Sequence, residues 1–82
     1  MSQAVTNDLD VRLLAPRDKH ATIFARLLEL TPGDALRIFN DHDPKPLQYQ
    51  LQAEHAGEFS WEPEQQGPEE WIIRIRRVIS AA

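Results

Sequence analysis

The 82-residue sequence contains no cysteine, which excludes disulfides, thiolate nucleophiles and cysteine-based zinc or iron–sulfur sites. No apolar run approaches the roughly 20 residues of a membrane-spanning helix. The first residues have neither a basic cluster nor a long apolar segment, so we expect no signal peptide. Basic residues are outnumbered, 9 against 13 acidic ones, and the net charge of −4 disfavours a nucleic-acid partner. We therefore expect a cytoplasmic protein that binds neither membranes nor nucleic acids.

Apolar residues recur with the periods of strands and helices. Alternation predicts strands over residues 9–12, 35–40, 59–62 and 71–76, with Trp61 and Trp71 in the core. Helical spacing predicts one helix capped by Asp18 and a second capped by Asp43, with Pro44 in its first position. The order β-α-β-α-β-β predicts an α+β fold, a two-layer α/β sandwich with a four-stranded mixed sheet and both helices on one face. Residues 1–8 are expected to form a flexible tail and residues 9–80 a single domain.

The helix-free face of this sheet is predicted to be rich in arginine. One interpretation is a solvated surface with cross-strand arginine–glutamate pairs. The other is a docking face for an acidic partner, to which exposed Phe39 and Ile72 would contribute. Residues predicted on this face are Asp10, Arg12, Arg37, Phe39, Ser60, Glu62, Ile72, Arg74 and Arg76.

Several short motifs resemble an uncharacterised bacterial family catalogued as a domain of unknown function and related to the TusA-like sulfur-carrier fold. They are Leu9-Asp10-Val11-Arg12, residues 16–20, Ile23-Phe24, Pro32-Gly33, residues 40–47 (NDHDPKPL), Tyr49-Gln50 and Phe59-Ser60-Trp61. The resemblance implies the same sandwich fold. It also implies an association with haemerythrin-like domains and with genes of nitrogen-oxide and anaerobic metabolism.

The sequence departs from the sulfur carriers where their chemistry occurs. Those proteins place a Cys-Pro pair at the start of the first helix, whereas this chain has Leu14-Ala15-Pro16-Arg17. A persulfide needs a thiol, so this chain is not a persulfide carrier.

Polar residues follow two strands that should run parallel. In a right-handed β-α-β unit, parallel strands end at the same end of the sheet, where ligands of open α/β sheets usually bind. The loops there bring together basic, amide and imidazole side chains. The candidate ligand-binding residues are Arg17, His20, Asn40, Asp41, His42 and Lys45.

Three interpretations of this cluster remain open. In the first, the aspartates cap helices and the prolines stiffen the chain. In the second, helix N-termini and basic side chains bind an anion or another small molecule. In the third, His20, His42 and Asp41 bind iron or zinc.

The sequence has no recognisable nucleophile–base–orienter arrangement, which favours a binding module over an enzyme. We expect a small binding or accessory domain for a small ligand or a protein partner, in redox or nitrogen-oxide metabolism. Haemerythrin-like or redox proteins are the partners that the resemblance implies. The alternative is a metal-dependent sensor or enzyme that uses His20 and His42. Cofactor identity stays open, as does the choice between a monomer and a weak dimer.

Overall fold

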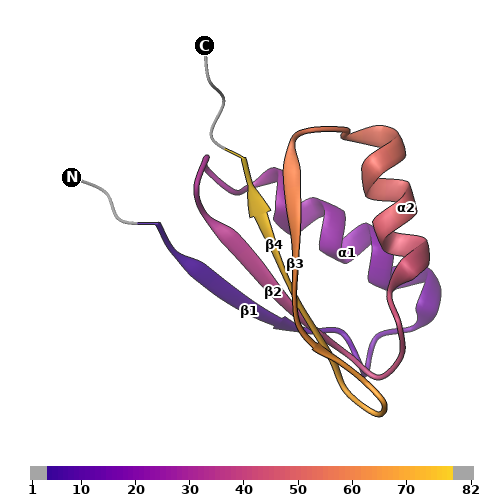
Figure 1. The fold of residues 1–82 in the computed structure, drawn as a ribbon. Helices are drawn as coiled ribbons and strands as arrows, with labels where there is room; N and C mark the ends of the chain where they lie inside the picture. The colour runs from indigo at the N-terminus through magenta and orange to yellow at the C-terminus, as the bar shows by residue number, and fades with distance from the viewer. Residues whose placement is uncertain (1–3, 79–82) are drawn as a thin grey trace.

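Four strands and two helices follow one another in the computed structural model, which describes residues 4–78 (Figure 1). They are β1 (Thr6–Asp10), α1 (Pro16–Leu28), β2 (Ala35–Asn40), α2 (Lys45–Glu54), β3 (Phe59–Gln66) and β4 (Trp71–Arg77). The predicted element order and the α+β class are confirmed, and both helices lie on the same side of the sheet. No helix within residues 4–78 is long and apolar enough to cross a membrane.

The sheet has the order β1-β2-β4-β3 and is mixed. β1 and β2 are parallel, whereas β4 runs antiparallel to both of its neighbours. Each of the first two strands is followed by a helix on the same face. The C-terminal ends of β1 and β2 and the N-termini of α1 and α2 therefore meet at one end of the sheet, which we call the site end.

The core lies between the helices and the sheet. Its buried members come from both layers: Val11, Ile23, Leu27, Leu30, Leu36, Ile38, Leu47, Leu51, Ile73 and Ile75. Trp61 is partly buried and packs against this cluster, as expected. Trp71 does not belong to it. Its ring instead covers Gly67 of the β3–β4 turn, where an added Cβ would lie 2.8 Å from the indole ring. The positive φ of Gly67, 78°, is a second reason for glycine there.

Both predicted helix caps are wrong. α1 begins two residues before Asp18, at Pro16, and the carbonyl of Ala15 accepts hydrogen bonds from the backbone N–H groups of Asp18 and Lys19. A proline in the first helical position has the required φ and needs no N–H partner, so it sets the boundary. α2 begins at Lys45 after Pro44, without a side-chain cap from Asp43.

β1 starts earlier than predicted. Thr6–Asp8 belong to the strand rather than to a tail, because they pair with β2 and the carboxylate of Asp8 accepts a 2.9 Å hydrogen bond from Arg37. The backbone of Val5 is also bonded, with its N–H 2.9 Å from Asp34 Oδ1. Residues 1–3 of the predicted tail and residues 79–80 of the predicted domain lie outside the described residues.

The arginines of the helix-free face are paired with carboxylates. Arg37 contacts Asp8 and Glu64, Arg74 contacts Glu64 at 2.8 Å, and Arg76 contacts Glu62 at 3.0 Å. This arrangement matches the interpretation as a solvated face with cross-strand pairs. Because these cations already have anionic partners within the chain, the structure gives no support to a docking face for an acidic partner.

These ion pairs predict that stability falls in acid. Hydrogen bonds from Arg12 lower the pKa of Asp10 to about 2, and those from Arg37 and Arg76 lower the pKa values of Asp8 and Glu62. A carboxyl group whose pKa is lower in the folded state stabilises the fold above its unfolded pKa. That contribution is lost as pH falls through the folded value.

We therefore expect the urea midpoint to decrease steadily between about pH 5 and about pH 2. The decrease should be smaller in Asp10→Asn, because asparagine does not titrate. Urea unfolding followed by circular dichroism at several pH values measures this. A midpoint independent of pH over that range would contradict the assignment.

Candidate binding pocket between two strand-to-helix loops

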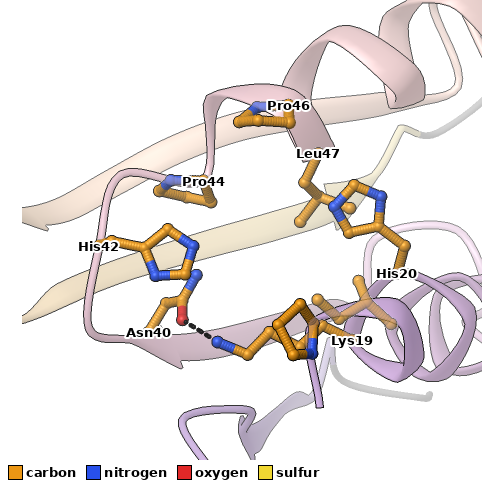
Figure 2. Close-up of a pocket in the computed structure, with 9 residues that line it drawn as sticks. Lys19, His20, Asn40, His42, Pro44, Pro46 and Leu47 are labelled. Carbon is orange, nitrogen blue, oxygen red and sulfur yellow. Dashed lines mark hydrogen bonds between the residues drawn. The ribbon is translucent and has the colours of Figure 1, made fainter. Parts of the chain in front are cut away.

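A pocket of about 100 Å³ opens at the site end of the sheet (Figure 2). The first two turns of α1 form one wall, and the β2–α2 connection with the first turn of α2 forms the other. Asn40, the last residue of β2, lies between them. Its lining residues are Pro16, Lys19, His20, Ile23, Asn40, His42, Pro44, Pro46 and Leu47. The parallel arrangement of β1 and β2 thus brings together side chains that are far apart in the sequence, as predicted for ligand sites of this topology.

A buried hydrogen bond joins the first turn of α1 to the end of β2 at the floor of the pocket. The ammonium group of Lys19 donates to Asn40 Oδ1 at 3.0 Å, and the two residues are only 8% and 5% exposed. The backbone N–H of Asp41 donates to the same oxygen, also at 3.0 Å. Two donors on one side identify that atom as the amide oxygen, so the orientation of the Asn40 side chain is fixed.

The other half of the Asn40 amide has no partner. Asn40 is 5% exposed and lines the pocket. Among residues 4–78, its Oδ1 atom accepts two hydrogen bonds, but no acceptor bonds to its Nδ2 atom. In Figure 2 the amide nitrogen lies on the pocket side, turned away from Lys19. Nδ2 is not among the fully buried side-chain atoms that lack a partner within residues 4–78, so it is accessible from the pocket. Nδ2 therefore offers a donor to whatever occupies the pocket.

Two histidines come from opposite walls of the pocket (Figure 2). His20 Nδ1 lies 2.7 Å from Gln50 Oε1, and His42 Nδ1 lies 2.7 Å from Asp41 Oδ1. The oxygen assignment of Gln50 is supported because its Nε2 donates to Glu54 at 3.0 Å. Both Nδ1 atoms thus face acceptors and must carry the proton. In a neutral imidazole this leaves Nε2 as the unprotonated atom.

Asp41 stands beside the pocket without lining it. The hydrogen bond from His42 and the nearby charge of Lys19 lower the pKa of the Asp41 carboxyl group. Lys19 Nζ is 3.9 Å from Asp41 Oδ1, which is an ionic contact but not a hydrogen bond. Because the Asp41 side chain is 57% exposed, its charge is largely solvated.

The predicted site residues separate into two groups. His20, Asn40 and His42 line the pocket, and Asp41 borders it through His42. Arg17 and Lys45 are exposed and do not line it.

The six candidate ligand-binding residues do not include Lys19, which enters the sequence analysis only as one of the basic side chains that could attract an anion, although Lys19 is the buried cation here. The signal was present. Lys19 precedes Ile23 by four residues and Leu27 by eight, so it shares the buried stripe of α1.

The arrangement does not form a metal centre. Residues 4–78 contain no group of three or more His, Asp or Glu side chains in position to hold a metal ion. His20 and His42 approach from different walls (Figure 2), and the Asp41 carboxylate is engaged by His42 Nδ1 at 2.7 Å. The structure thus does not bring the three predicted metal ligands together.

Prolines limit what the helix N-termini can offer. Pro16, Pro44 and Pro46 line the pocket, and a proline has no backbone N–H. Backbone donors at the pocket are therefore fewer than at an ordinary helix N-terminus. The main hydrogen-bond donors at the pocket are therefore side-chain groups, chiefly Lys19 Nζ and Asn40 Nδ2. The proline rings form apolar walls.

Comparison with known proteins gives a family and no function. A family model described as "Uncharacterized conserved protein (DUF2249)" matches residues 8–77, most of the chain. The expected resemblance to a domain family of unknown function is thereby confirmed. No curated protein and no solved structure matches the chain significantly. The relation to the TusA-like fold stays a prediction.

Proposed function

We propose that this chain, which belongs to the DUF2249 family, is a binding domain whose small-molecule ligand occupies the pocket between the start of α1 and the β2–α2 connection. The observation that carries this proposal is the free amide donor of Asn40. A 5% exposed side chain is fixed by two hydrogen bonds to its oxygen, while its nitrogen faces an open pocket.

The composition of the pocket supports this proposal. Small-molecule sites are concave and mostly apolar, with a few convergent polar groups that fix orientation. Here Ile23, Leu47 and the prolines form apolar walls around the Lys19, Asn40 and histidine nitrogens.

Binding is better supported than catalysis. No hydroxyl or thiol belongs to the described residues that line the pocket. Ser60 lies on β3, where its hydroxyl donates to Glu62 at 2.7 Å. Ser60 and Glu62 do not line the pocket, so neither side chain is placed to act with the pocket histidines.

Three further expectations from the sequence stay predictions. They are a protein partner, a role in redox or nitrogen-oxide metabolism, and the alternative of a metal-dependent sensor or enzyme that uses His20 and His42. The free donors support a small ligand, because they belong to a concave pocket of about 100 Å³ rather than to a broad surface.

Nitrogen-15 NMR with a library of low-molecular-weight fragments tests the proposal. Binding fragments should shift the side-chain amide signals of Asn40 and the backbone signals of Lys19, His20 and Leu47, because these residues line the pocket.

A second hollow of about 80 Å³ between α2 and β3, lined by Leu51 and His55 among others, serves as the internal control. Hits that perturb only this second hollow would contradict the proposal. So would a library that yields no hit at the Asn40 amide.

A further inference from the structure

We infer that the ligand is a small monocarboxylic acid with a short apolar tail, whose carboxylate is held jointly by Lys19 Nζ and Asn40 Nδ2. This inference rests on the proposed function, and it adds the chemical class of the ligand. Four observations carry it: the charge of the lining, the placement of the two donors, the absence of lining carboxylates and the size of the apolar part.

The charge of the pocket favours an anion. Among the described lining residues, Lys19 carries a positive charge, and no aspartate or glutamate belongs to the lining. Asp41 is the nearest carboxylate, 3.9 Å from Lys19 Nζ, but it is 57% exposed and bonded to His42. Its charge is therefore shared and screened by solvent, whereas the Lys19 side chain is only 10% exposed. An acid entering the pocket would give this cation a buried counter-charge.

The two donors are adjacent. Lys19 Nζ bonds to Asn40 Oδ1 at 3.0 Å, and Nδ2 is bonded to the same amide carbon as that oxygen. An ammonium group has three N–H bonds, and only one is used by Asn40, because the Asp41 oxygen is beyond hydrogen-bond distance. Lys19 Nζ and Asn40 Nδ2 thus lie on either side of the Asn40 Oδ1 atom, and a carboxylate that reaches both can accept one N–H from each.

The walls set the size of the rest of the ligand. A cavity of 150 Å³ lined by apolar side chains holds a benzene molecule. The present pocket, about 100 Å³, therefore admits an acid with an apolar tail of about two to four carbons. Inorganic oxyanions such as phosphate would meet the donors but would leave the proline, Ile23 and Leu47 walls uncovered. The apolar walls thus favour an organic acid.

The histidines close the polar side of the pocket. His20 and His42 line the pocket, and their Nδ1 atoms are engaged by Gln50 and Asp41. A hydroxyl or keto group on the acid would find their Nε2 atoms nearby. The essential recognition, however, is assigned to Lys19 and Asn40 alone.

Titration of butyrate against butyramide, monitored by the Asn40 side-chain amide signals in NMR, tests the inference on the unmodified protein. The two compounds have nearly the same shape, but only butyrate is charged. We expect butyrate to bind about 10–100 times more tightly, since hydrogen bonds to a charged group are the stronger ones. Formate and phosphate, which lack the tail, should bind more weakly than butyrate.

A variant pair tests the source of the charge. Lys19→Met keeps most of the apolar stem and should abolish the preference for butyrate over butyramide. Arg26→Met removes a positive charge from an exposed position of the same helix, so the preference should survive.

The outcomes separate the two proposals. Equal binding of acid and amide at Asn40 would overturn the acid assignment and leave the proposed function intact. Phosphate binding as tightly as butyrate would likewise overturn it. Absence of butyrate binding overturns the acid class, and absence of every fragment from the Asn40 amide overturns the proposed function as well.

Discussion

Replacement of Asn40 by leucine is expected to lower the free energy of unfolding by about 2–4 kcal/mol. Leucine has nearly the same size, so the packing volume changes little. The loss comes from Lys19, a residue only 8% exposed, whose ammonium group loses its acceptor at 3.0 Å. The backbone N–H of Asp41 loses the same acceptor. A buried charge left without a partner is among the most costly single changes in a protein.

A double-mutant cycle isolates this interaction. Lys19→Met removes the charge but leaves Asn40 Oδ1 bonded to the Asp41 N–H, so its cost should be about 1 kcal/mol. The double variant Asn40→Leu with Lys19→Met should be more stable than Asn40→Leu alone, because replacing both partners with apolar groups leaves no orphaned charge.

Urea unfolding of the wild type, both single variants and the double variant provides the four free energies. If the two single losses of unfolding free energy simply add, the Lys19 ammonium group and the Asn40 amide are not coupled. The buried hydrogen bond would then not stabilise the contact between α1 and the end of β2. Arg26→Met, at an exposed position, is the matched control and should change the stability by less than about 0.5 kcal/mol.

The fold was accessible from the sequence because its signals are periodic. In β4, Ile73 and Ile75 alternate with Arg74 and Arg76, and in α1 the buried Ile23 and Leu27 are four apart. Such repeats report which face is buried, and that is enough to define strands, helices and layers. Helix boundaries depend on single residues instead. Pro16 competes there with the capping preference of Asp18, and periodicity does not decide between them.

The place where the candidate residues gather follows from topology. Parallel strands bring His20, Asn40 and His42 to one end of the sheet, where all three line one pocket. Lys45 does not line this pocket. It stands two residues before the buried Leu47, which puts it on the opposite side of α2.

The orientation of the Asn40 side-chain amide could not be predicted from the sequence. It follows from a three-dimensional contact with Lys19, 21 residues away, and no sequence pattern encodes such a contact.

Replacement of Leu27 by alanine should be the most damaging simple truncation in α1, with a loss of about 2–5 kcal/mol. Leu27 is 0% exposed and belongs to the core cluster between α1 and the sheet. The substitution removes buried apolar surface and leaves a cavity that the surrounding strands fill only in part. Alanine and leucine both favour helices, so the effect reports packing rather than helix propensity.

Leu28 is the matched control, because it is the next residue of the same helix and is 55% exposed. Leu28→Ala should cost less than about 0.5 kcal/mol. At about 0.05–0.15 kcal/mol per residue, a chain of this length has a total stability of about 4–12 kcal/mol. Leu27→Ala thus removes a large share of it, and the melting temperature should fall by about 10–30 °C. Thermal and urea unfolding by circular dichroism measure both variants, and equal losses would contradict the burial of Leu27 against the sheet.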